Sequence, residues 1–264
     1  MLRALCGFAL SCVLSSASAA PPTPPEGSGS APMRFEWRHE GPLGVCQPRC
    51  RVWISAVGYI TADTPREFET FARDPRVRGA VLVLDSDGGS VLGTLALGRA
   101  IRSLDMITTI GRTTPLSVVD GGGRRRAMLS PKGSCESMCA FVLLAGTRRY
   151  VPPEAQVLVH QIWLGKKRKN ALESHYSAEE LNIVQRDIGR LALYTIEMGG
   201  GVELLETALR IPPWEPLYRL SDDELRRMRL TTLDVLFDRD VPKPEAPVAS
   251  SLATTVGQPG GGRD

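Results

Sequence analysis

Residues 79–101 read GAVLVLDSDGGSVLGTLALGRAI, and this stretch decides the fold. It begins with a continuous apolar run, which is typical of a strand covered on both faces. A tight, glycine-containing loop follows at residues 85–90, and apolar residues then recur at helical spacing from Val91 to Leu104. A buried strand, a tight turn and a helix in this order predict one βα unit of a parallel sheet.

The same alternation continues on both sides of this unit. We expect strands at residues 51–57, 106–110, 150–151 and 157–160. We expect helices at residues 64–74, 137–146, 178–198, 202–210 and 221–228. Residues 112–132, which contain GGGRRR, interrupt the alternation and are expected to form a long insertion. The repeated βα order predicts an α/β fold with a mostly parallel sheet in a single domain.

The two ends of the chain have compositions that do not suit a packed core. Residues 1–19 combine Arg3, an apolar run and a final Ala-Ser-Ala, which are the features of a secretory signal peptide. A membrane anchor is the alternative. Residues 20–32 and 241–264 are of low complexity and are expected to be a disordered linker and tail. The folded domain is therefore expected to span residues 33–240 of a protein that is periplasmic or secreted.

The overall composition excludes several classes of protein. The chain has 264 residues, is 42% hydrophobic and carries a formal net charge of +3, so its bulk is not intrinsically disordered. The charge is too small to indicate nucleic-acid binding. The chain has only three histidines, and none lies at ligand spacing from a cysteine, so we expect no metal and no cofactor.

Four cysteines follow the predicted signal peptide and form two pairs with C-x3-C spacing. They are Cys46, Cys50, Cys135 and Cys139. In an exported protein such cysteines are expected to form disulfides, either within or between the pairs. Free thiols and a zinc site are the alternatives, and the spacing alone does not choose among the pairings.

Three features suggest a catalytic site. Gly88 and Gly89 follow a buried strand and precede a helix, where glycine allows a tight turn whose N–H groups face an incoming carbonyl. Ser137 lies at the start of an apolar helix, where the next N–H, that of Met138, can face an oxyanion. His160 lies at the carboxyl end of an apolar run, which is where α/β sheets place functional residues.

Each feature has a plainer interpretation when it is taken alone. The glycines suit any strand-to-helix turn, a serine at a helix start is commonly an N-cap, and a lone histidine commonly has a structural role. Together, however, a glycine turn, a serine on a helix start and a histidine on a later strand form the pattern of acyl transfer. In that pattern Ser137 attacks and His160 takes its proton.

The residues resemble the Clp protease proteolytic subunit, a family with the ClpP/crotonase fold. VLVLDSDGGSVLGTLALGRAI at residues 81–101 is similar to the family's strand and Ser-Pro-Gly-Gly-like turn, ESMCAFVLLAG at 136–146 to its nucleophile segment, and TRRYVPPEAQVLVHQ at 147–161 to its histidine strand. The likeness covers about residues 51–236. It implies a spiral of βαβ units in which Ser137 is the nucleophile of a serine endopeptidase and His160 is its base.

The resemblance carries further implications. The backbone of Gly88, with the adjacent Gly89, and the N–H of Met138 would form the oxyanion hole. A peptide or an unfolded protein segment would be the substrate, and the protein would be a homo-oligomer. No ATPase partner is implied, because an exported protein has no ATP supply.

The chain departs from the family at several positions. Asp87 stands where proline is usual, and the position of the triad aspartate falls at Leu217, which cannot orient a histidine. Glu215 is the best substitute, and a Ser-His dyad oriented by a backbone carbonyl or water is the alternative. The missing aspartate also favours a second reading of the chain, a catalytically impaired binding or scaffold protein. An acyl-CoA enzyme is disfavoured, because export removes the protein from CoA.

Two basic runs lie beside the predicted site in the sequence, at residues 124–126 and 166–169. They either border the mouth of the site and favour acidic or extended substrates, or form solvated loops.

Overall fold

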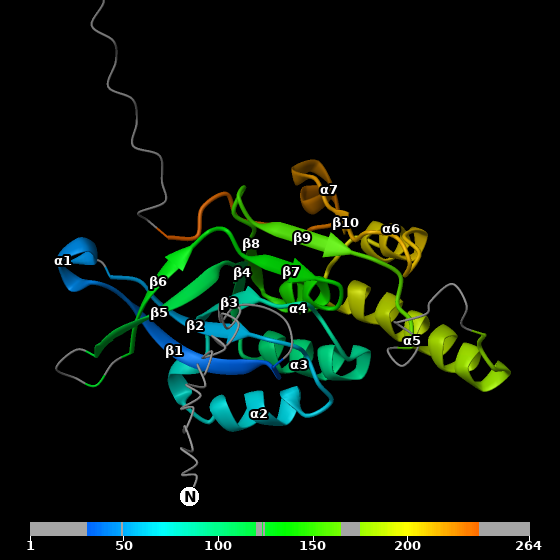
Figure 1. Ribbon diagram of the computed structural model, residues 1–264, viewed down its shortest axis with the longest axis horizontal. Helices are drawn as coiled ribbons and strands as arrows, with labels where there is room; N and C mark the ends of the chain where they lie inside the picture. Colours follow the sequence, from blue (N-terminus) through cyan, green and yellow to red (C-terminus); the bar gives the residue numbers. More distant parts are fainter. Residues whose placement is uncertain (1–30, 49, 120–122, 124, 165–174, 238–264) are drawn as a thin grey trace, which may run out of the picture.

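The computed structural model describes residues 31–48, 50–119, 123, 125–164 and 175–237. A seven-stranded, mostly parallel sheet has the strand order β5-β6-β1-β2-β3-β4-β8, and a three-stranded sheet has the order β10-β9-β7 (Figure 1). The strands are β1 Arg34–Glu40, β2 Val52–Val57, β3 Val81–Asp85, β4 Ile107–Ile110, β5 Arg112–Val119, β6 Arg125–Ser130, β7 Ser134–Glu136, β8 Arg148–Tyr150, β9 Gln156–Val159 and β10 Tyr218–Arg219. The protein is therefore an α/β protein, as the sequence predicts.

One side of the large sheet is entirely parallel. Strands β2, β3, β4 and β8 pair in parallel, with Leu82 opposite both Ile54 and Thr108. All four residues of β4 are buried, which agrees with the rule that parallel strands are covered on both faces. The continuous apolar run that begins at residue 79 thus becomes β3, an interior strand between β2 and β4.

Helices connect and cover these strands (Figure 1). They are α1 Leu43–Cys46, α2 Thr64–Phe71, α3 Val91–Ser103, α4 Cys139–Ala145, α5 Ala178–Glu197, α6 Glu203–Arg210 and α7 Asp222–Arg227. Helix α3 begins where the Ser90 hydroxyl accepts a hydrogen bond from the Gly93 N–H at 3.1 Å. Helix α5 begins at a capping box between Ser177 and Glu180 and ends just before Gly199, whose φ is 69°.

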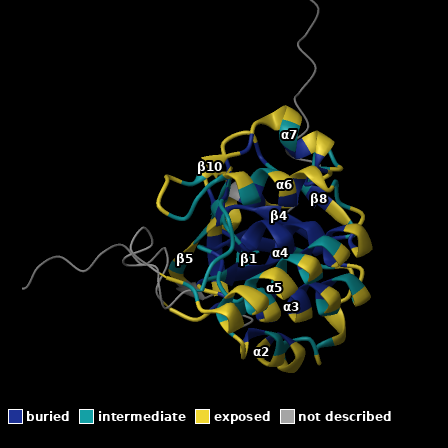
Figure 2. Cartoon of the chain, turned by 90° about the vertical axis from the view of Figure 1, so that its right-hand side faces the viewer, coloured by how far each residue is buried: buried dark blue, intermediate teal, exposed yellow. Residues whose placement is uncertain are grey.

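Helix α4 is the most deeply placed helix, because all seven of its residues are buried (Figure 2). Two guanidinium groups occupy its C-terminal end. Arg102 Nε donates to the Ala145 carbonyl at 2.7 Å, and Arg149 Nη1 donates to the Gly146 carbonyl at 2.8 Å. These donors satisfy carbonyls that have no partner within the helix. The end of α4 opposite Ser137 is thereby fixed in the core.

The predicted insertion at residues 112–132 contains two strands that the sequence analysis does not predict, the antiparallel pair β5 and β6. Residues 112–119 read RTTPLSVV, and their β-branched side chains favour a strand. Pro115 is tolerated because β5 is an edge strand. The Trp53 indole N–H donates to Thr113 Oγ1 at 3.0 Å and fastens this hairpin to β2.

Strand β1 was not predicted either. It pairs antiparallel with β2 and places Phe35 edge-on against Phe68 of α2, with ring centroids 5.0 Å apart. The alternation of Phe35 and Trp37 with charged residues is the local signal for this strand. Ala31, expected in the linker, already belongs to the folded part, because its carbonyl accepts from the Tyr59 N–H at 2.8 Å.

The remaining terminal predictions lie outside the described residues. These are the signal peptide at residues 1–19, nearly all of the linker and the tail at residues 241–264. Within the part of the chain that the structure describes, no helix combines the length and the apolar character needed to cross a bilayer.

Candidate functional site

A cleft of about 570 Å³ contains most of the residues that the sequence singles out. It is lined by the turn after β3, the turn before α4, the segment after β9 and part of α5. The lining residues with candidate roles are Gly89, Ser137, Met138, His160, Asp187, Glu215 and Leu217. The structure thus brings Ser137 and His160, which are 23 positions apart in the sequence, to one cavity.

Ser137 occupies a sharp turn between β7 and α4, with a φ of 53°. Positive φ is uncommon for a residue other than glycine and persists only where the surroundings enforce it. Here the Ser137 N–H donates to the Leu158 carbonyl of β9 at 2.7 Å, and the Glu136 N–H donates to the Ser86 carbonyl at 2.8 Å. The N-cap of α4 is Met138, so the interpretation of Ser137 as an N-cap serine is wrong. The turn instead presents Ser137 to the cleft.

Gly88 lies against this turn with a φ of 86°. A Cβ built on Gly88 would lie 2.6 Å from the Glu136 carbonyl oxygen and 2.8 Å from the Met138 nitrogen. Only a residue without a side chain allows the two turns to approach so closely. The glycine turn is therefore required by the packing around Ser137.

The backbone amides near Ser137 differ in their partners. The Gly88 N–H donates to Ser86 Oγ at 3.2 Å, so it is already used within the turn. Gly89 and Met138 line the cleft, and among the described residues no acceptor takes a hydrogen bond from either N–H. Of the three candidate oxyanion-hole residues, these two line the cleft with amides that have no acceptor among the described residues.

His160 follows β9 directly and lines the cleft. Its Nδ1 lies 2.7 Å from the carbonyl oxygen of Gln161. A carbonyl oxygen only accepts, so Nδ1 carries the proton and Nε2 is the nitrogen that can take one. The ring also packs edge-on against Trp163, with centroids 6.1 Å apart.

Three further residues with candidate orienting roles line the cleft. Leu217 and Glu215, from the segment that the sequence singles out, both line the cleft. Asp187 of α5 lines it as well and was missed. Its Oδ1 pairs with Arg190 Nη1 at 3.0 Å. No spacing in the sequence links Asp187 to Ser137, because only the packing of α5 beside the cleft brings them near.

The cysteines form two disulfides, each within one C-x3-C pair: Cys46 with Cys50, and Cys135 with Cys139. This pairing excludes the free-thiol and zinc alternatives for these residues and is consistent with an oxidising, exported compartment. Among the described residues, no group of His, Cys, Asp or Glu has the arrangement of a metal site.

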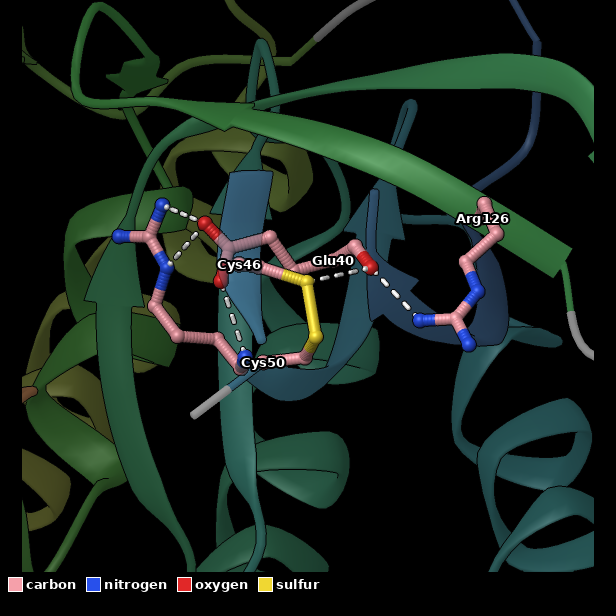
Figure 3. A network of polar contacts seen from close by, with 5 residues as sticks. Glu40, Cys46, Cys50 and Arg126 are labelled. Atoms are coloured by element: carbon pink, nitrogen blue, oxygen red, sulfur yellow. Dashed lines mark hydrogen bonds and ion pairs between the residues drawn. A yellow bond between two sulfur atoms is a disulfide. The ribbon is translucent and has the colours of Figure 1, made fainter. Parts of the chain in front are cut away.

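The Cys46–Cys50 disulfide belongs to a polar network (Figure 3), and none of its residues lines the cleft. Arg51 Nη2 pairs with the Glu40 carboxylate at 2.7 Å, and Arg126 Nη1 donates to the Glu40 carbonyl at 2.7 Å. Cys46 Sγ contacts the same carbonyl at 3.4 Å, without a hydrogen bond because a disulfide sulfur carries no hydrogen.

The basic runs do not border the cleft where the structure describes them. Arg126 belongs to the network around Glu40, and Arg125 pairs with Glu36 at 3.4 Å. Arg124 and residues 166–169 lie outside the described residues. The described lining of the cleft is acidic, with the carboxylates Asp87, Glu136, Asp187 and Glu215. An acidic-substrate preference therefore finds no support in the described residues.

The chain matches no protein-family model and no curated protein. Its function has to be argued from the geometry of the cleft.

Proposed function

We propose that this protein is a serine hydrolase in which Ser137 is the nucleophile and His160 is the general base. The observation that carries the proposal is the placement of Ser137 on a strained strand-to-helix turn, at φ 53°, in the same cleft as His160. Strained backbone is typical of functional sites, and a serine and a histidine that line one cleft are the residue types that acyl transfer requires.

The proposed reaction begins when Ser137 Oγ attacks a carbonyl carbon of the substrate and His160 Nε2 takes the hydroxyl proton. The negative oxygen of the tetrahedral intermediate accepts hydrogen bonds from the N–H groups of Met138 and Gly89. His160 then returns the proton to the leaving amine, which leaves an acyl group on Ser137. Water, activated by the same histidine, hydrolyses this ester and restores the serine.

The Gln161 carbonyl supplies the orienting role that a carboxylate has in a complete triad. It fixes the tautomer of His160 through the 2.7 Å contact with Nδ1. A neutral carbonyl stabilises the imidazolium less than a carboxylate does, so we expect slower turnover than in an enzyme with a complete triad. The dyad alternative is thus better supported than a triad that uses Glu215.

The wider proposal follows the resemblance to the Clp proteolytic subunit. The domain would be one unit of a ClpP/crotonase-like spiral, exported, acting on peptides or unfolded segments without an ATPase partner. Assembly into a homo-oligomer is supported by apolar side chains on the outer faces of α3 and α5. Leu92, Leu193 and Ile196 are 53%, 70% and 63% exposed.

A fluorophosphonate probe tests the proposed function directly, because it labels only an activated serine. We expect a single adduct on the wild-type protein, located at Ser137 by peptide mass spectrometry, and none on Ser137→Ala. His160→Ala should lower the labelling rate strongly. Ser103→Ala is the matched control, because Ser103 Oγ is exposed and donates only to the Ala100 carbonyl. Absence of labelling in folded wild-type protein would overturn the proposal.

The second candidate is a binding or scaffold protein with the same fold and impaired chemistry. Leu217 in the lining of the cleft favours it, since an apolar side chain there gives no help to His160. Peptide binding by wild-type protein that is neither labelled nor active would identify this case.

A further inference from the structure

The two disulfides have the same spacing in the sequence but different positions relative to the proposed nucleophile. Cys135 is the central residue of β7 and Cys139 is the first residue of α4, so their bridge spans the turn that carries Ser137. The other bridge belongs to α1, which lies well away from β7 and α4 in Figure 1. Both cysteines of the first bridge are completely buried.

The chain on both sides of this turn is held by the rest of the protein. Strand β7 pairs in parallel with β9, with Cys135 opposite Val157 and Glu136 opposite Leu158. Helix α4 is buried along its whole length. Between these anchors only Ser137 and Met138 connect strand to helix. The disulfide joins the two anchors directly and sets their Cα atoms 5.2 Å apart.

The disulfide fixes two features on which the proposed chemistry depends: the backbone conformation of Ser137 and the position of the Met138 N–H. The positive φ of Ser137 is unfavourable for a serine, and a turn with freer ends would relax away from it. The Met138 N–H, which faces the developing oxyanion in the proposed mechanism, belongs to the same turn. A misplacement of about 1 Å in such a site costs about 100-fold in rate.

We propose that the Cys135–Cys139 disulfide is a positioning device for the nucleophile, and that the serine hydrolase works at its full rate only while this bridge is intact. The inference rests on the proposed function. Cys135 and Cys139 are positioning residues, since they act on the substrate only through Ser137 and Met138. The Cys46–Cys50 bridge has no such role.

The proposal makes the hydrolase sensitive to reduction once local opening exposes the bridge, because Cys135 and Cys139 are buried in the closed turn. A dithiol reductant would transfer two electrons and two protons to the bridge, giving the thiols of Cys135 and Cys139, while the reductant itself becomes a cyclic disulfide. Loss of the bridge lowers activity, and reoxidation restores it. An exported, oxidising setting keeps the bridge closed.

The second disulfide supplies a matched control. Both bridges close loops of the same length, so a chain-entropy account assigns them equal contributions to stability. A double variant Cys46→Ala/Cys50→Ala therefore reports the general effect of losing such a bridge. If Cys135→Ala/Cys139→Ala loses more activity than this control, the difference is caused by the position of its bridge next to Ser137.

The test measures fluorophosphonate labelling and peptide hydrolysis for both double variants, at a temperature where circular dichroism shows each to be folded. We expect Cys135→Ala/Cys139→Ala to lower the labelling rate and kcat by about 10- to 100-fold, with KM nearly unchanged. Cys46→Ala/Cys50→Ala should stay within about threefold of wild type. Hydrogen exchange should show faster exchange of the residue 136–139 amides in the first variant alone.

Equal labelling rates for wild type and Cys135→Ala/Cys139→Ala would overturn the inference, and so would equal losses in both double variants. If wild-type protein is not labelled at all, the proposed function fails. Hydrogen exchange still decides the positioning role, because unchanged exchange at residues 136–139 rejects it. If Cys135→Ala/Cys139→Ala does not fold, the Cys46→Ala/Cys50→Ala protein provides the same comparison, because Cys135–Cys139 is then the bridge that a dithiol reduces. Activity that survives reduction of this bridge rejects the proposal.

Discussion

A Cβ on Gly88 would lie 2.9 Å from the Cβ of Ser137. The turn after β3 and the turn before α4 thus meet at a distance that excludes every side chain except hydrogen. The same hypothetical atom would lie 2.6 Å from the Glu136 carbonyl oxygen, which belongs to the backbone and cannot rotate away. Any larger residue at position 88 must therefore displace the turn that carries Ser137.

Gly88→Ala should abolish most of the proposed hydrolytic activity. The new methyl group clashes with backbone on the Ser137 side, and alanine is strained at a φ of 86°. The kcat should fall by about 100-fold, the size expected for a displacement of about 1 Å.

Gly79→Ala is the control that separates backbone strain at positive φ from a steric clash of the new methyl group. Gly79 also has positive φ, at 71°, but an added Cβ would meet nothing within 4 Å. This variant should lose about 1 kcal/mol of stability and keep its activity. Similar kinetics for the two variants would mean that the contact between Gly88 and Ser137 is unimportant.

Glu215→Gln should leave kcat within about threefold of wild type. The reason is that His160 Nδ1 already donates to the Gln161 carbonyl, which takes the place of a triad acid in the proposed mechanism. Replacing the acid of a complete triad costs about 10⁴-fold. Steady-state kinetics on a peptide ester would measure the difference, and a loss approaching that size would identify Glu215 as the orienting acid. Asp187→Asn is the companion variant, because Asp187 lines the same cleft.

The elements that could be predicted from the sequence are those whose signals are local. Strand β3 is indicated by a continuous apolar run, α3 by apolar residues at helical spacing, and α5 by the glycines that follow it. Ser137 and His160 also fall in the cleft, because their βα units are correctly ordered. The resemblance of the segments around them guided their selection.

The features that were missed depend on contacts between distant segments. Strand β1 and the β5–β6 hairpin become strands by pairing within the large sheet, and Asp187 reaches the cleft only through the packing of α5. The conformation of Ser137 has the same origin. A serine before an apolar helix is usually interpreted as an N-cap. Here the hydrogen bond from the Ser137 N–H to the Leu158 carbonyl and the close approach of Gly88 direct Ser137 toward the cleft instead.

Arg102 and Arg149 should compensate for each other at the end of α4. Both donate to the Leu144, Gly146 and Met198 carbonyls, so either one covers these acceptors when the other is lost. Burial lowers the pKa of Arg149 to about 10, with a smaller contribution from the charge of Arg102. Each Met substitution should therefore cost about 1–2 kcal/mol.

The double variant Arg102→Met/Arg149→Met should cost at least about 1 kcal/mol more than the sum of the single variants, because the carbonyls are then left without a donor. Urea unfolding of all four proteins gives the coupling energy. Simple additivity would show that the two guanidinium groups act independently.

Asp74 should make the protein less stable in acid. Hydrogen bonds from the Arg76 side chain and backbone, with a further one from the Trp37 indole, lower the pKa of this carboxyl from 3.8 to about 2. Between these values the unfolded chain binds more protons than the folded one, so the free energy of unfolding falls as the pH decreases through this window and is unaffected above it. Asn at this position retains a hydrogen-bond acceptor but does not titrate. Thermal unfolding from pH 6 to about pH 2 should thus show wild type more stable than Asp74→Asn near neutrality, with the difference in Tm shrinking below about pH 4. A difference that stays constant across this range would show that the Asp74 charge does not stabilise the fold.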